Sequence, residues 1–367
     1  MDAKFLLRSG VRRLGGMARE GLYLRTGIDA TMPESISCEV NERCNYKCRY
    51  CHFWRLDDYV NEMTIEEWQR TLRGLQEFLG RCTVQFIGGE PFLKKGFVDL
   101  LEFCRQNGID WGVITNGSAL TARISARVAA AHPTNIDISI DSPIDSINDF
   151  VRGAPGSLAT IEAGVRRLRT ARDDGNHHFP IRIKPTITRI NFRSLPLLAE
   201  WIARCGADTI DFQPVHSVPF WTAAMRAELW PTPEECEEMR VVIGELVQQQ
   251  KSGAPIETAA ERLLSIPDQF LGRTVQTSIP GPCRVSLRKL AIKANGDVRT
   301  CWDFAAIGNV RHASPRDIWY GAAARGNRAQ TVACPKVGAA CANSCNDPRS
   351  LRQDIERGLL MLRSTMR

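Results

Sequence analysis

The sequence predicts an α/β fold in which helices wrap a parallel sheet. Short apolar stretches alternate with longer stretches of helical periodicity through the first two thirds of the chain. Such alternation is typical of parallel sheets covered by helices. Cysteines, glycines and polar residues follow several of the apolar stretches. Because ligands of this fold class bind at the carboxyl ends of the strands, we expect a ligand site at that edge.

The predicted elements follow one another in a regular order. Strands are expected at residues 35–40, 83–87, 110–115, 135–140, 181–186 and 208–213. The helices between them are expected at residues 64–79, 96–107, 120–131, 157–172 and 194–205. The first helix opens with a capping box, in which Thr64 is the N-cap and Glu67 reaches back to it.

Three cysteines follow the first predicted strand in the run Cys-x-x-x-Cys-x-x-Cys, at Cys44, Cys48 and Cys51. Three thiolates on one loop are able to cap three irons of a cubane cluster. Full ligation takes four cysteines, so the fourth iron would need a ligand from outside the protein. The alternative is a structural zinc site that also uses His52, because zinc takes thiolate and imidazole ligands.

A glycine pair follows the second predicted strand, in the stretch Gly88-Gly89-Glu90-Pro91. Two glycines at a strand end let the backbone approach a ligand closely and leave its donors and acceptors open. Taken alone, the stretch would favour a plain turn.

With both motifs in this order, the chain resembles the radical S-adenosylmethionine (SAM) enzymes, and Tyr50 before the last cysteine fits their pattern. The resemblance implies a [4Fe-4S] cluster on the three cysteines, with the amino and carboxylate groups of SAM on the fourth iron. It also implies a partial (β/α)6 barrel. Within that barrel it assigns the backbone of Gly88, Gly89 and Glu90 to the amino group of SAM.

Polar residues at later strand ends extend this site. Asn116 follows the third strand, and Ser139 and Asp141 share one face of the fourth because side chains alternate along a strand. The resemblance implies that these three residues contact the ribose or carboxylate of SAM. It places residues 184–191 and Gln213 near the sugar and adenine. For each of them a turn or cap is the alternative.

A smaller unit follows a proline-containing segment at residues 252–282. The Asn295-Gly296 pair predicts a hairpin, because both residues accept positive φ. This hairpin would bring Cys283 and Cys301 towards one site. A helix is expected at residues 315–328, followed by three more cysteines, Cys334, Cys341 and Cys345.

These cysteines resemble the auxiliary iron–sulfur modules of the SPASM/Twitch group, whose glycine-to-cysteine spacing is met by Gly296 and Cys301. The complete pattern has seven cysteines and two clusters, and two cysteines are missing here. The resemblance therefore implies one auxiliary [4Fe-4S] cluster on Cys283, Cys301 and two of the last three cysteines. The family's three-residue gap favours Cys341 and Cys345 over Cys334. A zinc ribbon is the alternative.

The chain thus divides into an amphipathic extension at 1–33, the barrel at 34–251, a connector at 252–282 and the auxiliary domain at 283–367. In the extension, Leu7, Val11, Leu14 and Met17 form an apolar stripe at helical spacing, with arginines elsewhere on the wheel. Such a helix packs on the neighbouring domain or makes a peripheral contact with an anionic membrane.

Composition agrees with a protein of about two domains. The 367 residues are 43% hydrophobic, and no apolar run approaches the roughly 20 residues that cross a bilayer. Because the N-terminus also lacks a secretory signal, we expect a cytoplasmic protein. Thirteen cysteines in that compartment favour metal binding over disulfides. The net charge of +7 comes without a basic, aromatic-rich patch, so no nucleic-acid partner is expected.

The resemblance implies an enzyme that takes an electron from a flavodoxin or ferredoxin. It would cleave SAM to a 5′-deoxyadenosyl radical and abstract a hydrogen atom from its substrate. We expect a small metabolite (a sugar, cyclitol or nucleoside) that is dehydrogenated or epimerised, because the roughly thirty residues before the barrel leave no room for a peptide-recognition domain. The alternative is a peptide maturase that cross-links or epimerises a ribosomal precursor. The third hypothesis is a non-catalytic iron–sulfur protein, but such a protein would not need an open iron site. The sequence identifies no catalytic acid or base.

Overall fold

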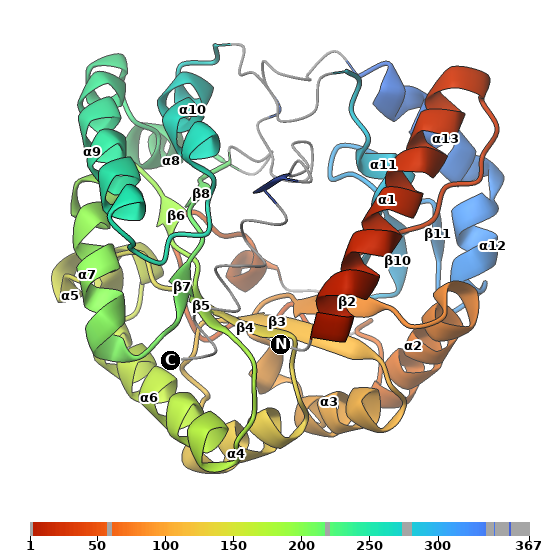
Figure 1. The fold of residues 1–367 in the computed structure, drawn as a ribbon, viewed down its shortest axis with the longest axis horizontal. Coiled ribbons are helices and arrows are strands. Elements are labelled where there is room, and N and C mark those ends of the chain that lie inside the picture. The colour runs from red at the N-terminus through yellow and green to blue at the C-terminus, as the bar shows by residue number, and fades with distance from the viewer. Residues whose placement is uncertain are drawn as a thin grey trace.

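The computed structural model describes residues 3–56, 61–216, 221–273, 281–334, 341 and 352–353. Within them, a nine-stranded sheet forms the wall of an open barrel (Figure 1). Six strands lie side by side in parallel, in chain order: β1 (Ser35–Glu39), β2 (Thr83–Ile87), β3 (Asp110–Thr115), β4 (Asn135–Ile138), β5 (Ile181–Ile183) and β7 (Thr209–Ile210). The predicted α/β class is confirmed.

The last two predicted strands are each split in two. Beyond β5 lies β6 (Thr186–Ile187), beyond β7 lies β8 (Gln213–Pro214), and β6 and β8 form a separate parallel pair. Pro185 interrupts β5 because it has no N–H to donate to the ladder. Phe212 interrupts β7, since it donates its N–H to the Thr258 hydroxyl at 2.7 Å.

The helices predicted between the strands lie on the outer side of the sheet (Figure 1). They are α2 (Ile65–Leu79), α3 (Phe97–Gln106), α4 (Ala122–Ala130), α6 (Ser157–Asp174) and α7 (Leu195–Cys205). Each helix end lies within two residues of its predicted position. The capping box of α2 is present in both directions, as predicted.

The two faces of the sheet differ in polarity. Phe86 and Ile138 are fully buried and form part of the hydrophobic core between sheet and helices. Asp137 and Arg182 lie on the opposite face, which lines the inside of the barrel. The apolar side of each strand therefore holds the helices in place, and the polar side is left for chemistry.

Several elements were not predicted from the sequence. They are the helices α5 (Asp145–Arg152), α8 (Ala223–Leu229), α9 (Pro233–Lys251) and α10 (Ala260–Phe270), and the 3-10 turns η1 (Phe53–Arg55), η2 (Pro91–Leu93) and η3 (Phe192–Ser194). The signal for α9 was present, because Thr232 and Glu235 form a capping box around Pro233 at the first helical position. The segment predicted as a connector contributes α10 and a parallel bridge between Ile256 and Ile210.

The C-terminal unit continues the same sheet. It consists of α11 (Val285–Arg288), β9 (Lys289–Ile292), β10 (Asp297–Arg299), β11 (Gly308–Asn309), α12 (Pro315–Tyr320) and α13 (Ala322–Val332). The predicted hairpin is confirmed, because β9 and β10 pair in antiparallel fashion across Gly296, whose φ is +90°. β9 also pairs with β1 in parallel. The predicted helix at 315–328 is two helices, since the backbone is extended at Gly321.

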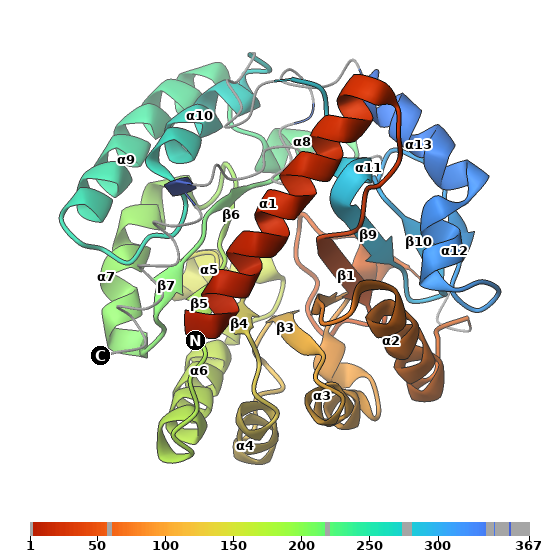
Figure 2. The same cartoon turned by 45° about the vertical axis from the view of Figure 1, so that its right-hand side comes forward.

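Helix α1 (Ala3–Thr26) lies across the amino-terminal ends of the first strands (Figure 2). The Arg12 guanidinium donates to the carbonyl oxygens of Pro33 and Arg81, which lie just before β1 and β2. Glu20 forms ion pairs with Arg284 and Arg288 of the C-terminal unit at 3.4 and 3.9 Å. The predicted amphipathic helix is present, and it packs through polar side chains. Among the described residues, no helix is both long and apolar enough to cross a membrane.

Candidate active site

The cysteine loop follows β1 and is held against the glycine pair after β2. The N–H groups of Gly89 and Glu90 donate to the carbonyl oxygens of Asn41 and Arg43 at 3.0 and 2.7 Å. A Cβ on Gly89 would lie 2.0 Å from the Arg43 oxygen, and one on Gly88 would lie 2.3 Å from the Asn41 oxygen. The interpretation that these donors stay open to a ligand is therefore wrong. Glycine is required at both positions because the backbone of the cysteine loop comes so close. The assignment of the Gly88, Gly89 and Glu90 backbone to SAM stays a prediction.

The three cysteines of the loop are free thiols that influence one another electrostatically. Burial raises the pKa of Cys44 to about 11 and that of Cys51 to about 12, and it also raises the pKa of Cys48. The Asn116 amide nitrogen lies 3.9 Å from the Cys44 sulfur. Metal ligation needs thiolates, which are unfavourable in a buried site. Iron binding would therefore have to offset the cost of ionising these thiols and would release their protons.

A buried arginine that sequence reasoning missed lies beside the loop. Arg152, at the end of α5, places Nη1 3.8 Å from the Cys48 sulfur and Nε 2.9 Å from Asp141. Tyr50 donates its hydroxyl to the same Asp141 carboxylate at 3.2 Å. Within the described residues, the buried Nη2 of Arg152 has no hydrogen-bond partner. Burial lowers the pKa of Arg152, but Asp141, Tyr50 and Cys48 together raise it further than burial lowers it, so the guanidinium stays protonated.

Two carboxylates among the residues assigned to SAM accept hydrogen bonds from protein groups, whereas contact of Asp141 and of the Glu90 backbone with SAM stays a prediction. The Asp141 carboxylate accepts from the Thr186 N–H at 2.8 Å and from Tyr50, and it pairs with Arg152. The Glu90 carboxylate accepts from the Thr115 hydroxyl and the Asn116 N–H, each at 2.7 Å. Both carboxylates therefore position neighbouring strands and loops. Burial raises the pKa of Glu90 to about 7, because water no longer solvates its charge.

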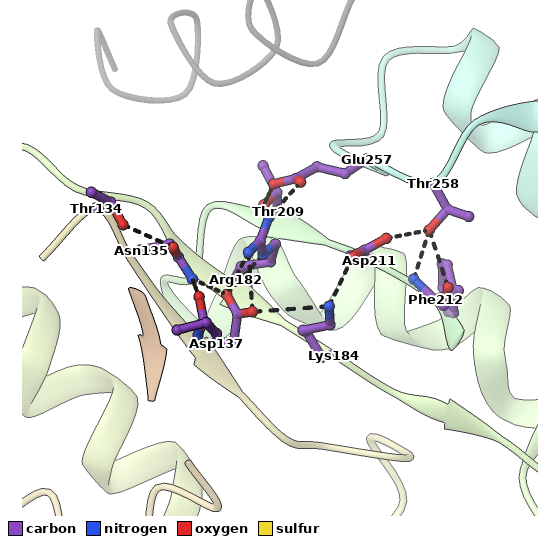
Figure 3. Close-up of polar contacts among 11 residues, drawn as sticks. Thr134, Asn135, Asp137, Arg182, Lys184, Thr209, Asp211, Phe212, Glu257 and Thr258 are labelled. Carbon is purple, nitrogen blue, oxygen red and sulfur yellow. Dashed lines mark hydrogen bonds and ion pairs between the residues drawn. The ribbon is translucent and has the colours of Figure 1, made fainter. Parts of the chain in front are cut away.

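The inside of the barrel carries a chain of buried charges (Figure 3). Arg182 of β5 donates to Asp137 of β4 at 2.8 and 3.0 Å and to Glu257 at 2.9 Å. Lys184 pairs with Asp211 at 3.0 Å. Buried charges are stable only when they are paired. This network therefore holds β4, β5 and the segment of Glu257 together. The Lys184 side chain keeps 21% of its surface exposed.

The two predicted cluster sites approach each other around Lys293, directly after β9. The Lys293 ammonium lies 5.6 Å from the ring centre of Phe53 and 5.2 Å from that of Trp302. Phe53 is two residues from Cys51, and Trp302 is next to Cys301. Lys293 also forms an ion pair with the buried Glu39. Lys293, Glu39, Phe53 and Trp302, which we call the bridge cluster, were missed because no local pattern relates them.

The predicted auxiliary ligands are only partly described. The Ser286 and Thr300 hydroxyls are 2.7 Å apart, so the segments that carry Cys283 and Cys301 lie together, as the hairpin predicts. Cys301 interacts electrostatically with Cys341. Cys334 follows α13, and Cys345 lies outside the described residues. The choice of ligands among the last three cysteines stays a prediction.

Ser139 and Gln213 lie where the strand pattern predicts. Ser139 directly follows β4 and is half-buried, and its N–H donates to the Thr115 carbonyl oxygen at 3.0 Å. Gln213 lies in β8, and its N–H donates to the Pro185 carbonyl oxygen at 3.1 Å. Contact of either side chain with SAM stays a prediction.

The residues present fit the groups that the sequence pattern implies. Three thiols on one loop, which influence one another electrostatically, are the type of donor that a cubane with one open iron takes. Arg152 Nη1 and the Asn116 amide nitrogen supply donors to the Cys48 and Cys44 sulfurs. Hydrogen bonds of this kind are among the features that tune an iron–sulfur cluster.

Two family models match the chain: the radical SAM superfamily over residues 38–181 and the SPASM iron–sulfur cluster-binding domain over residues 283–346. These matches favour iron–sulfur ligation over zinc at both cysteine sets. The radical SAM domain carries a [4Fe-4S] cluster and SAM, and the SPASM domain carries auxiliary iron–sulfur ligation.

Relatives and solved structures are similar to the chain over both units. It is 27% identical to the PqqA peptide cyclase of Rhodopseudomonas palustris over 80% of this chain and 75% of that protein. It is 26% identical to the PqqA peptide cyclase of Bradyrhizobium diazoefficiens over 62% of this chain, which spans only 58% of that relative's length. The structure of Streptococcus suis SuiB bound to S-adenosylmethionine matches with a TM-score of 0.64 at 16% identity, covering 85% of this chain and 71% of SuiB. The chain is a radical SAM enzyme with a C-terminal SPASM domain.

Proposed function

We propose that the protein is a peptide maturase that modifies residues of a ribosomally made precursor by cross-linking or epimerisation. The observation that carries this proposal is the likeness to PqqA peptide cyclase, which extends over 311 residues and thus beyond the barrel. This likeness supports a peptide substrate better than the small metabolite that the sequence favoured. The short N-terminal region does not oppose it, because a separate protein is able to recognise a leader peptide.

The barrel interior is suited to hold a charged peptide segment. Lys184 and Lys293 retain 21% and 17% of their side-chain surface, and each is paired with a carboxylate. Trp302, a member of the bridge cluster, is 45% exposed. The centre of the exposed Trp302 ring lies 5.6 and 5.2 Å from the Lys289 and Lys293 ammonium groups, so the site offers both stacking and charge to a peptide side chain.

The chain's residues would act by holding and enclosing the reacting groups. Cys44, Cys48 and Cys51 would hold the barrel cluster, and Arg152 would donate to its sulfur while Asp141 balances the arginine charge. When bound, the cluster and SAM supply the one-electron chemistry that removes a hydrogen atom from an unactivated carbon. The barrel walls orient that carbon and exclude water, which is what a protein contributes to radical chemistry. A flavodoxin or ferredoxin would supply the electron.

The test uses the reconstituted protein with SAM and a reductant under anaerobic conditions. Short peptides encoded beside the gene and a panel of sugars, cyclitols and nucleosides are compared as stimulants of 5′-deoxyadenosine formation. We expect a peptide to stimulate and to lose two hydrogens on cross-linking, or to take up deuterium from heavy water on epimerisation. The Cys48→Ala variant is the control and should form no 5′-deoxyadenosine. Stimulation by a small metabolite with every peptide unchanged would contradict the proposal.

A further inference from the structure

Helix α1 is packed with its apolar side outwards. Val11, Leu14 and Leu22 are 63%, 53% and 39% exposed, and Ala18 between them is exposed as well. The spacing of these four residues places them on one face of the helix. Ile28, just past the helix end, is 59% exposed. We call Val11, Leu14, Ala18 and Leu22 the outer stripe.

The opposite side of α1 is anchored to the protein by charges. Arg13 pairs with Glu34 at 3.1 Å, and Glu20, which is 2% exposed, faces Arg284 and Arg288. A Cβ on Gly16 would lie 1.1 Å from a Glu34 oxygen, so the helix backbone is pressed against this side. Turning the helix to bury the outer stripe would leave buried charges without partners, which is strongly unfavourable. The outward orientation is therefore built into the fold.

Helix α1 is open around the outer stripe and carries a net positive charge, and of its basic residues Arg12 and Arg13 contact the rest of the protein. The helix contains six basic residues and a single acid, and that acid is the buried Glu20. Arg25, which lies at helical spacing from Leu22, is exposed. A Cβ on Gly10 or Gly21 would meet no atom within 4 Å, so nothing overhangs the helix at either position.

We propose that α1 docks the protein on an anionic lipid surface, with the outer stripe entering the interface. An exposed apolar stripe beside an exposed arginine, on a basic helix with little net hydrophobicity, fits the pattern of helices that lie in the membrane plane. The absence of exposed acids on the described helix fits a negative partner, and anionic lipids attract such arginines. Because α1 covers the amino-terminal ends of β1 and β2, the cysteine loop at their carboxyl ends faces away from the lipid. The proposal does not depend on the substrate of the enzyme.

The experiment is co-sedimentation of the cluster-loaded protein with vesicles of phosphatidylcholine, alone or with about 30% phosphatidylglycerol. We expect binding to the anionic vesicles that weakens as salt increases, because exposed charges are screened. Val11→Glu should weaken that binding about tenfold, since it places a carboxylate in the interface. Val241→Glu on α9 is the matched control, because Val241 is 65% exposed, and it should bind as the parent protein does.

Circular dichroism and iron content would establish that both variants keep the fold and the clusters. Equal binding of Val11→Glu and Val241→Glu would overturn the proposal, and so would parent protein that stays in the supernatant with anionic vesicles. A concentration-dependent dimer that Val11→Glu abolishes would overturn it as well, by assigning the outer stripe to a second copy of the chain.

Discussion

Arg152 places a cationic nitrogen within hydrogen-bonding reach of a cluster-loop sulfur. Its side chain is 4% exposed, so water screens its charge little. A nearby positive charge and an N–H to sulfur both favour the reduced form of an iron–sulfur cluster. The next arginine along the loop, Arg49, pairs with Glu228 at 2.8 Å and is 38% exposed.

Replacing Arg152 should change the reduction potential of the barrel cluster. We expect Arg152→Gln to lower it by on the order of 100 mV, since a buried charge is lost and Asp141 is left unbalanced. Arg152→Lys keeps the charge and should shift the potential less. EPR-monitored redox titration of the reconstituted proteins measures the effect.

Arg49→Gln provides the matched control, because its exposed charge is already screened and the potential should stay near that of the parent. A potential for Arg152→Gln equal to that of Arg49→Gln would show that the arginine does not act on the cluster.

The buried Glu90 makes stability depend on pH. Burial raises the pKa of its carboxyl from 4.5 to about 7, so the folded protein holds this proton more tightly than the unfolded chain does. The protonated Glu90 carboxyl therefore contributes fully to the free energy of unfolding below about pH 4.5. This contribution, about 3 kcal/mol in total, is lost as the pH rises through about 7. We expect Glu90→Gln, which cannot ionise, to gain stability relative to the parent protein as the pH rises from 5.5 to 8.

Urea denaturation across that pH range measures the difference. Glu245 is an exposed carboxylate on α9, and Glu245→Gln should show no such trend. A flat difference between Glu90→Gln and the parent would mean that the Glu90 carboxyl titrates normally.

At the level of elements, the glycine pair determines how the cysteine loop lies on the sheet. The loop and the residues after β2 are hydrogen bonded at Asn41 and Arg43, and a side chain at either glycine would collide with loop backbone. A second approach of this kind occurs after α5, where a Cβ on Gly153 would lie 2.3 Å from the Lys47 oxygen. The backbone of the cysteine loop thus packs closely against glycines on two sides.

Gly89→Ala should therefore displace the cysteine loop. The new Cβ would lie 2.0 Å from backbone oxygen, which cannot move without the loop, so we expect a destabilisation of roughly 1–3 kcal/mol. Iron bound after reconstitution should fall by about half if the auxiliary cluster is kept. Iron analysis and the loss of the SAM-responsive EPR signal check this result.

Gly244→Ala on α9 is the control for the chemistry of the substitution. No atom lies within 4 Å of the new Cβ there, and alanine in a helix should stabilise the protein by up to about 1 kcal/mol. Full iron binding by Gly89→Ala would refute the close-approach argument.

At the scale of the whole molecule, β9 and α1 join the C-terminal unit to the barrel. β9 pairs with β1, so the SPASM unit extends the barrel sheet instead of hanging from a linker. Glu20 bridges α1 to Arg284 and Arg288, more than 260 residues away. Burial lowers the pKa of Arg288, and the Glu20 charge opposes this effect.

Glu20→Gln should weaken the contact between α1 and the C-terminal unit. It leaves two poorly solvated guanidinium groups without their carboxylate, so we expect a loss of about 3 kcal/mol in the free energy of unfolding. The urea midpoint of Glu20→Gln is compared with that of Glu245→Gln, which removes a solvated charge. Identical midpoints would show that the ion pairs carry no net stabilisation.

Local patterns accounted for most of the fold and for the metal-binding loop. The helix boundaries, the hairpin at Gly296 and the α/β class follow from periodicity, caps and turn chemistry, which depend on neighbours in the sequence. The strand breaks at Pro185 and Phe212 were missed. For Phe212 the reason is a hydrogen bond to Thr258, a residue 46 positions away.

The sequence by itself determined the family, the three-cysteine loop and the order of strands and helices, because each rests on residues a few positions apart. Only the tertiary structure decided that Arg152 meets Cys48, that Lys293 lies between Phe53 and Trp302, and that α1 turns its apolar side outwards. In each case the arrangement depends on which charged residue, distant in the sequence, pairs with a buried charge. Burial makes that pairing obligatory, and no local spacing records it.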